Sequence, residues 1–137
     1  MTNLLNQPFV LPSGATLPNR ICKTALSEGL ADTNNDSTNR LETLYRKWSE
    51  GGTGLILSGN VQVDRWHLER PGNVVLDEQT NLEALSSLAK AGTVGGNHFW
   101  LQLSHTGRQV SNFINSEPLA PSSVEMDLPR NFGLTFA

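Results

Sequence analysis

The run at residues 54–58 (GLILS) constrains the fold of this chain more than any other segment. Its three central residues are all apolar, without the polar alternation of a half-exposed strand. A run of this kind suits a strand that is covered on both faces, as strands are in parallel sheets. We therefore predict a strand at 54–59 inside a parallel sheet.

Two helices and two further strands are predicted around this run. Apolar residues at helical spacing predict helices at 38–50 and 81–92, and further apolar runs predict strands at 20–26 and 98–103. The side chains expected to pack against the sheet are those of Leu41, Leu44, Tyr45, Trp48, Leu85 and Leu88. The order strand, helix, strand, helix, strand is typical of an α/β fold built from βαβ units.

The remaining segments are predicted to be turns and loops. Residues 9–17 hold two short apolar runs around Pro-Ser-Gly, which indicates a β-hairpin. Either Ser37 or Thr38 can cap the start of the first helix. The glycine-rich segment 51–54 (GGTG) follows this helix, so the segment is interpreted as a C-terminal cap and not as a phosphate loop. Residues 64–73 form a long loop, and the pattern dissolves after residue 111.

Polar residues follow each predicted strand at its carboxyl end. The first strand runs into TALSE, the second into SGNVQ and the third into QLSHTGR, whereas plain glycine turns precede the second and third strands. Parallel α/β sheets bind their ligands at the carboxyl ends of the strands. The sequence therefore predicts a functional site at this edge, where Ser27, Asn60 and Gln102 should lie close together.

Other site chemistries have little support in the sequence. There is no G-x-G-x-x-G, no P-loop and no G-x-S-x-G nucleophile elbow. The histidines His67, His98 and His105 lack metal-ligand spacing, so no metal site is predicted. Cys22 lies within a predicted strand and is expected to be a small buried residue.

Composition favours a soluble chain in a reducing compartment. The net charge of −3 gives no reason to expect nucleic acid or an anionic membrane as a partner. No apolar run approaches the roughly 20 residues that a bilayer requires, and a single cysteine excludes an internal disulfide. We expect a cytoplasmic protein, and the sequence leaves its oligomeric state open.

Four segments resemble the Old Yellow Enzyme family of FMN-dependent NAD(P)H oxidoreductases. They are LPNRICKTALSEG, LYRKWSEGGTGLILSGNVQVD, RPGNVVLDEQ and WLQLSHTGRQ, and they occur in the family's order and at its spacing. The resemblance implies a (β/α)₈ TIM barrel, a fold that needs about 250 residues. Residues 1–137 would then be a partial domain, the N-terminal portion of the barrel, with a loop-rich excursion at 107–137.

The resemblance also implies residues that bind the cofactor FMN. They are Thr24, Ala25, Leu26 and Ser27 along the flavin, Asn60 at the end of the second strand, and Gln102 in the third strand. Ser27 stands where the family places a threonine or cysteine against a flavin carbonyl, although it can also simply cap a strand end. Asn60 replaces a usual alanine, which leaves a backbone contact to the flavin and an open role for its side chain.

Gln102 matches the glutamine that hydrogen-bonds the flavin and its ribityl chain. An amide buried in an apolar strand needs partners, because leaving it unpaired costs roughly 1–3 kcal/mol. For His105 and Arg108 a role in ordering the loop and a role at the cofactor are both open. Glu28 and Gly29 stand where some family members have a substrate-binding tyrosine, so that contact is not expected here.

By resemblance, the whole protein takes hydride from NADH or NADPH onto FMN and passes it to an electron-poor small molecule such as an activated alkene. The family's substrate-binding pair, its proton donor and its phosphate loops match nothing in this chain, so no catalytic residue is predicted and residues 1–137 alone should be inactive. The alternative is a small non-catalytic α/β module that binds a ligand or partner. The unpatterned last residues and the lack of a fourth strand count against that alternative.

Overall fold

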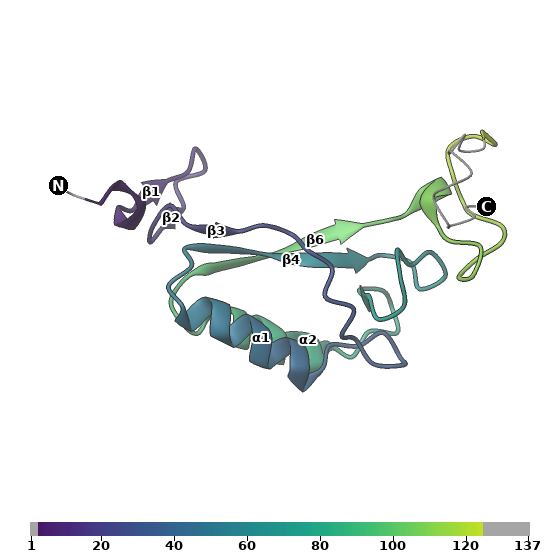
Figure 1. Ribbon diagram of the computed structural model, residues 1–137, viewed down its shortest axis with the longest axis horizontal. Helices are drawn as coiled ribbons and strands as arrows, with labels where there is room; N and C mark the ends of the chain where they lie inside the picture. Colours follow the sequence, from purple (N-terminus) through teal and green to yellow (C-terminus); the bar gives the residue numbers. More distant parts are fainter. Residues whose placement is uncertain (1–2, 125–137) are drawn as a thin grey trace.

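The computed structural model describes residues 3–124, in which two helices and two long strands set the architecture. The helices α1 (Asn39–Glu50) and α2 (Leu82–Thr93) both lie on one face of a parallel sheet whose centre is β4 (Leu55–Gln62) (Figure 1). The long partner of β4 is β6 (His98–Ser104), which runs parallel to it from Leu55↔His98 to Gln62↔Ser104. The predicted α/β fold with a parallel sheet is confirmed, and an antiparallel pairing of these strands is excluded.

Two short strands pair with β4 beside its ends. The strand β3 (Cys22–Lys23) pairs with the start of β4, and β5 (Val74–Val75) pairs with its end, both in parallel. Because β6 occupies the whole of one edge of β4, β3 and β5 must share the other edge. Every backbone pairing of this sheet therefore passes through β4.

The N-terminal segment forms the predicted hairpin. It starts with a 3-10 turn, η1 (Leu4–Asn6), and then β1 (Phe9–Val10) pairs antiparallel with β2 (Thr16–Leu17). At the other end of the described chain, β6 is followed by a 3-10 turn, η2 (Gly107–Gln109), and by irregular backbone. Part of the predicted loop-rich excursion, 125–137, lies outside the described residues.

The helix boundaries follow from capping groups in the sequence. Thr38 accepts a hydrogen bond from the backbone N–H of Leu41, which decides between the two predicted caps in favour of Thr38. Asn81 does the same for the backbone N–H groups of Glu83 and Ala84 at the start of α2. Gly52, with φ +87°, carries the backbone out of α1 as the glycine cap predicted.

The core lies between the helices and the sheet. Tyr45 is 1% exposed and Ile56 is fully buried, and the buried cluster is completed by Leu41, Val61, Val74 and Leu88. Trp48, Leu85, Phe99 and Leu101 pack against this cluster. Of the six side chains predicted to face the sheet, only Leu44 stays outside the cluster, half-buried on α1.

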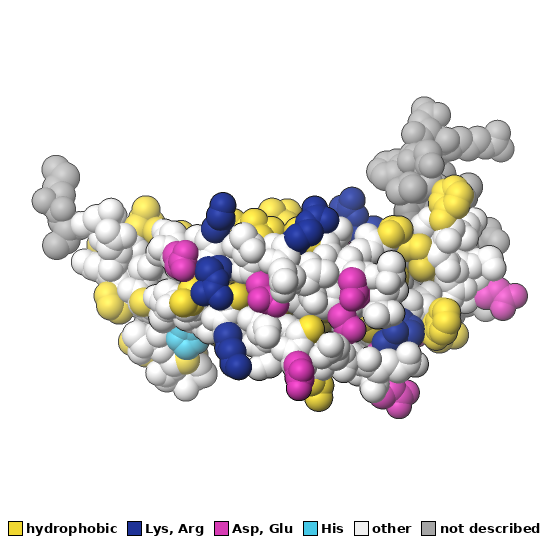
Figure 2. All heavy atoms as spheres, turned by 90° about the horizontal axis from the view of Figure 1, so that it is seen from below, with side chains coloured by type: hydrophobic (Ala, Val, Ile, Leu, Met, Phe, Trp, Pro, Cys, Tyr) yellow, Lys and Arg dark blue, Asp and Glu magenta, His cyan; other side chains and the backbone are white. Residues whose placement is uncertain are grey.

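The two faces of the molecule differ. The helix-covered face carries Lys and Arg side chains interspersed with Asp and Glu, as is usual for a solvated surface (Figure 2). On the opposite face of the sheet the side chain of Trp100, which alternates with the core-facing Phe99 and Leu101, is uncovered and 44% exposed. In a closed barrel this face would point into the interior, where side chains from other strands fill the space.

Two predictions about the first strand were wrong. The strand expected at 20–26 contains only Cys22 and Lys23, because the backbone beyond Lys23 leaves the sheet and crosses β4 at Gly59. Cys22 is exposed and not buried. Alternate side chains of a strand point to opposite faces, and since Lys23 turns toward Tyr45 and Trp48 of α1, Cys22 faces the uncovered side.

The central strand also differs in length from its prediction. It continues to Gln62, beyond the predicted end at residue 59, because Val61 and Gln62 pair with β5 as well as with β6. No strand was predicted at Val74–Val75, since two residues are too few to show a period.

Candidate functional site

A cluster of hydrogen-bonded polar side chains lies at the carboxyl ends of the strands. Asn60 and Gln102 are opposite one another in the β4–β6 pairing, and the Gln102 Nε2 donates to the Asn60 Oδ1 at 2.7 Å. Ser27, from the segment after β3, joins them through a shared partner, Glu69. The predicted convergence of Ser27, Asn60 and Gln102 is confirmed, at the end of the sheet away from Gly54, which precedes β4.

Glu69 is the residue that sequence reasoning missed. Its Oε2 accepts a hydrogen bond from the Ser27 hydroxyl at 2.5 Å and another from the Asn60 Nδ2 at 2.7 Å. Partial burial favours a raised pKa for this carboxyl group, but the hydrogen bonds from Ser27, Asn60 and Asn73 outweigh it and hold the pKa below its ordinary value. Glu69 is therefore a carboxylate at neutral pH.

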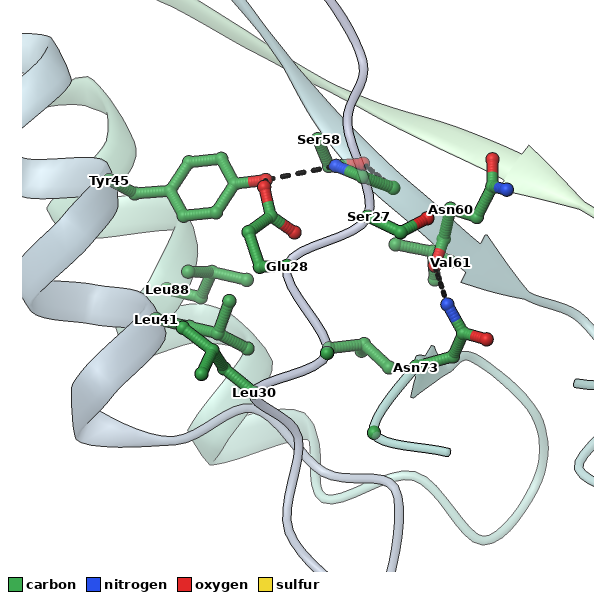
Figure 3. A pocket seen from close by; sticks show the side chains of 14 residues that line it. Ser27, Glu28, Leu30, Leu41, Tyr45, Ser58, Asn60, Val61, Asn73 and Leu88 are labelled. Carbon is green, nitrogen blue, oxygen red and sulfur yellow. Dashed lines mark hydrogen bonds between the residues drawn. The ribbon is translucent and has the colours of Figure 1, made fainter. Parts of the chain in front are cut away.

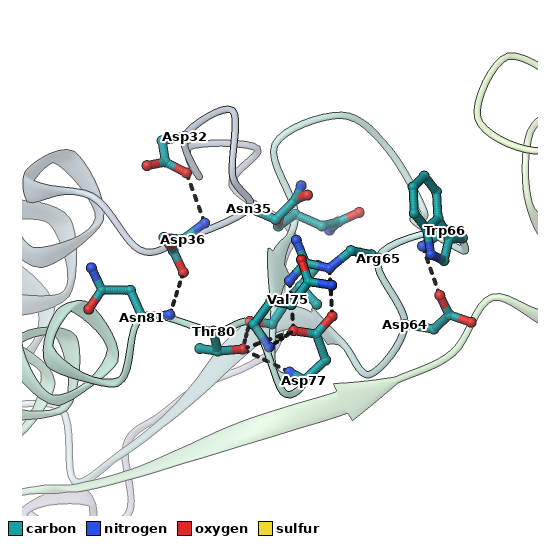
Figure 4. A network of polar contacts seen from close by, with 12 residues as sticks. Asp32, Asn35, Asp36, Asp64, Arg65, Trp66, Val75, Asp77, Thr80 and Asn81 are labelled. Atoms are coloured by element: carbon teal, nitrogen blue, oxygen red, sulfur yellow. Dashed lines mark hydrogen bonds and ion pairs between the residues drawn. The ribbon is translucent and has the colours of Figure 1, made fainter.

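Two anchors hold the loop that carries Glu69. Asn73 is 2% exposed, and its side chain accepts from the backbone N–H of Arg70 at 2.8 Å and donates to the Asn60 carbonyl at 3.3 Å. Arg65 forms a bidentate pair with Asp77 at 2.7 and 2.6 Å, the centre of a polar network that reaches the start of α2 (Figure 4). Both ends of the loop are thereby fixed to the sheet and to the α2 region.

A second set of contacts fixes the segment that leads to Ser27. The Tyr45 hydroxyl donates to the Glu28 Oε1 at 2.7 Å and accepts from the buried N–H of Gly59 at 3.0 Å (Figure 3). Lys23 pairs with the same Glu28 oxygen at 3.2 Å. Burial, together with the hydrogen bond to the Glu28 carboxylate, raises the pKa of Tyr45 far above its ordinary value, so the phenol keeps its proton.

Gly59 makes this close crossing possible. A Cβ atom at this position would lie 2.5 Å from the carbonyl oxygen of Leu26 and 2.8 Å from the Cα of Ser27. Any other residue would push the segment away from β4. A glycine in the middle of a strand thus places Ser27 within reach of Glu69.

The other predicted cofactor residues in this segment make no side-chain hydrogen bond among the described residues. Thr24 and Leu26 are exposed, and Ala25 is half-buried. Their predicted contact with the flavin stays a prediction. Leu26 is nevertheless 67% exposed, so its apolar side chain is free to pack against a ring system.

Gln102 is not the buried amide in need of partners that was predicted. Gln102 is exposed, and its Nε2 already donates to Asn60. It is exposed because alternate side chains of β6 point away from the helices. Its Oε1 takes no hydrogen bond from residues 3–124, so this oxygen remains able to accept one.

Asp64, His67 and His105 form a separate cluster, whose ligand-type atoms lie within 4.8 Å of one another. The hydrogen bonds assign both rings to protein partners. His67 Nδ1 faces Asp64 at 2.8 Å and His67 Nε2 accepts from the backbone N–H of Leu119 at 2.9 Å, so the Nδ1 carries the proton and cannot ligate a metal. These contacts tie the chain after β6 to the loop after β4.

The same segment decides how His105 and Arg108 are used within the described chain. His105 Nδ1 accepts from the backbone N–H of Gly107 at 2.9 Å, and Arg108 reaches the carbonyl of Val124 at 3.5 Å. Thr106 adds a hydrogen bond to the carbonyl of His67 at 2.9 Å. These are contacts that order the loop, the first of the two roles left open for His105 and Arg108.

The enclosed space beside the cluster is too small for a cofactor. A cavity of about 20 Å³ lies between Glu28, Tyr45 and Asn73 (Figure 3), whereas pockets for small molecules usually measure about 300–1,000 Å³. A flavin would have to lie on the open side of the polar cluster.

Across residues 3–124, no helix has both the length and the apolar character that a bilayer crossing requires.

The fold defines the class of protein first. In structure, the chain superposes on the Old Yellow Enzyme homologue of Zymomonas mobilis with a TM-score of 0.80 at 23% identity, covering 98% of this chain and 38% of that one. It superposes on a 2-naphthoyl-CoA reductase with a TM-score of 0.85 at 22% identity, covering 99% and 22%. The chain has the fold of part of a (β/α)₈ barrel.

The sequence comparison then specifies the family. No protein-family model matches the chain. It is 34% identical over 131 residues to the NADH-dependent flavin oxidoreductase iliE of Neonectria sp. (strain DH2), and 31% identical over 130 residues to the protein of that name from Hypocrea jecorina (strain QM6a). These matches cover 89% and 88% of this chain but only 17% and 32% of the relatives.

The resemblance indicated by the four motifs is confirmed. The chain is similar in sequence to part of the NADH-dependent flavin oxidoreductases and in fold to part of the Old Yellow Enzymes. It spans between about a sixth and a third of the length of the two curated relatives.

Proposed function

We propose that this chain supplies part of the flavin site of an FMN-dependent oxidoreductase that takes hydride from NADH or NADPH. Bound FMN would supply the hydride-transfer chemistry between the nicotinamide and an electron-poor small molecule such as an activated alkene. We further propose that residues 1–137 alone lack this activity, and that the protein acts in the cytoplasm without nucleic acid or membrane partners.

The observation that carries the proposal is the polar cluster at the carboxyl ends of the strands. Ser27, Asn60 and Gln102, which the family resemblance implies as cofactor-binding residues, converge on one edge of a parallel sheet. This edge is where barrels of this kind bind their ligands. Its donors and acceptors suit the polar edge of a flavin ring.

The chain's own residues have distinct tasks in this proposal. The free Oε1 of Gln102 can accept a hydrogen bond from the flavin ring N–H, and the exposed Trp100, two residues earlier in β6, offers an apolar surface on the same face. Gly59 and Tyr45 hold the segment before Ser27 against β4. All of these residues bind and orient the cofactor, and none is placed to exchange a proton with a substrate.

Flavin retention by a Gln102 variant tests the proposal. We use the protein encoded by the complete reading frame that contains residues 1–137, called the complete protein below. Gln102→Ala removes one hydrogen-bonding amide, which is worth roughly 1–3 kcal/mol and should weaken FMN binding by about fivefold or more. FMN per polypeptide after gel filtration, and its dissociation constant by fluorescence titration, measure the effect.

The matched control is Gln79→Ala, at an exposed glutamine in the loop before α2. It should leave FMN binding unchanged, because Gln79 lies outside the polar cluster. Equal FMN affinity in the Gln102 variant and in the wild type would refute the role of Gln102. A folded complete protein that binds no FMN would favour the non-catalytic module.

A further inference from the structure

The hydroxyl proton of Ser27 is committed to a protein acceptor. A serine hydroxyl has one proton, and a carboxylate can only accept hydrogen bonds. The 2.5 Å contact between the Ser27 Oγ and the Glu69 Oε2 therefore directs that proton at Glu69. While Glu69 is ionised, Ser27 can accept hydrogen bonds but cannot donate one to a second group.

The same carboxylate sets the direction of two amides. Because Glu69 can only accept, the Asn60 amide must turn its Nδ2 toward Glu69, at 2.7 Å. The Asn60 Oδ1 then faces Gln102 and accepts from its Nε2 at 2.7 Å. The Gln102 Oε1 is left pointing away from Asn60, as an acceptor on the open side of the cluster.

We propose that Glu69 is a positioning residue of the cofactor site: it withholds the Ser27 proton from the flavin and, through Asn60, fixes the Gln102 amide with its carbonyl oxygen outward. This inference rests on the proposed function and adds to it. It reverses the role that resemblance gives Ser27, since a hydroxyl that donates to Glu69 does not stabilise charge on a flavin carbonyl.

The inference has a measurable consequence for the reduced flavin. A hydrogen bond donated to a flavin carbonyl favours the electron-rich reduced ring over the oxidised one. With Glu69 present, Ser27→Ala should change the ratio of affinities for reduced and oxidised FMN by less than about twofold, because no donor is lost. With Glu69→Ala the Ser27 hydroxyl loses its acceptor and its proton is released toward the flavin, whereas Glu69→Gln keeps an amide oxygen that can still accept it.

A double-mutant cycle on the complete protein tests this coupling. The bound-flavin midpoint potential is measured for wild type, Ser27→Ala, Glu69→Ala and the double variant. In the Glu69→Ala background, adding Ser27→Ala should lower the relative affinity for reduced FMN by about fivefold, the value of one hydrogen bond. Glu78→Gln, at an exposed glutamate before α2, is the matched control and should leave the effect of Ser27→Ala small.

A second readout does not require flavin. The titration of the Glu69 carboxyl group, followed by carbon NMR in the flavin-free complete protein, should have a pKa below the ordinary glutamate value and should rise in Ser27→Ala and in Asn60→Ala. An unchanged titration in both variants would overturn the network. This readout keeps the inference testable if a Glu69 variant fails to retain its flavin.

The outcomes separate the two proposals. If the wild-type complete protein binds no FMN, the proposed function fails, while the NMR titration still decides whether Glu69 organises Ser27 and Asn60. If FMN binds but Ser27→Ala has the same effect on the potential with and without Glu69, the withheld proton is refuted and the proposed function stands.

Discussion

The substitution Tyr45→Phe tests the contacts that hold the cofactor segment against the sheet. The phenylalanine ring keeps the packing of Tyr45 against Trp48 and Phe99, whose ring centroids lie 5.1 and 4.9 Å away. What is lost is one hydroxyl with two hydrogen bonds, to the Glu28 carboxylate and from the buried N–H of Gly59. The substitution therefore isolates the polar contacts from the packing.

The magnitude follows from what these two groups lose. An unpaired buried N–H costs about 1–3 kcal/mol, and a hydrogen bond to a charged group is worth about 1.5–3 kcal/mol. Glu28 keeps its ion pair with Lys23, which reduces the second loss. We expect the free energy of unfolding of the complete protein to fall by about 2–4 kcal/mol.

Urea unfolding at neutral pH, followed by far-UV circular dichroism, measures this change. The matched control is Thr43→Val, which removes an exposed hydroxyl that bonds only to its own helix, to the carbonyl of Asn39. That control should change stability by less than about 0.5 kcal/mol. A Tyr45→Phe variant that unfolds at the same urea concentration as the control would show that the hydroxyl does not hold the segment.

The stability that Tyr45 contributes should also depend on pH in the alkaline range. Burial and the Glu28 carboxylate raise the pKa of Tyr45 in the folded state above the unfolded value of 10.0. Tyr45 thus stabilises the fold fully below pH 10, and its contribution is lost as the pH rises above this value, by about 1.4 kcal/mol per pH unit. The stability of Tyr45→Phe should fall less steeply above pH 10 than that of the wild type.

Three further predictions concern the crossing segment, the histidine cluster and the isolated chain. Gly59→Ala should lower the free energy of unfolding by about 1–3 kcal/mol and weaken FMN binding, because the alanine Cβ would overlap Leu26 and Ser27. Urea unfolding measures the stability and a flavin titration measures the FMN affinity. Unchanged values of both would exclude the close crossing. The pKa of Asp64 is lowered because hydrogen bonds from Trp66 and His67 outweigh the effect of burial, so its stabilisation is present above the ordinary value of 3.8 and is lost as the pH falls through the lower folded value. Asp64→Asn should flatten this acid dependence in urea unfolding between neutral pH and about pH 3, and equal slopes would contradict it. Residues 1–137 alone should be poorly soluble or partly unfolded, should bind no FMN tightly and should oxidise no NADH. The reason is that Trp100 and other apolar side chains of the sheet lie uncovered, and each forfeits up to about 1.5–3 kcal/mol of folding free energy. A cooperative thermal melt by near-UV circular dichroism, with flavin bound, would refute this prediction.

The elements with a strong local pattern could be predicted from the sequence. The stripe Leu41, Tyr45 and Trp48 gave α1 almost to the residue, and the apolar run at 54–58 gave the central strand. The convergence of Ser27, Asn60 and Gln102 also followed, because parallel strands end at the same edge of a sheet. These inferences need only the spacing of apolar residues along the chain and the parallel order of the strands.

Glu69 could not be predicted, because its position depends on contacts distant in sequence. The loop 64–73 has no period, and its path is set by the Arg65–Asp77 pair and by Asn73. The exposure of Cys22 was missed for a related reason. In the short edge strand β3, Lys23 turns toward α1, so its neighbour Cys22 points to the uncovered face. A strand of two residues carries too little pattern to predict which of the two side chains faces the helices.

Hydrogen exchange of the complete protein, with and without FMN, tests most directly whether this chain forms part of a flavin site. The account predicts slower amide exchange on FMN binding in residues 24–30 and 100–105, which border the polar cluster, and unchanged exchange in the helices α1 and α2 on the opposite face. FMN that binds tightly yet protects neither of these segments would contradict the account.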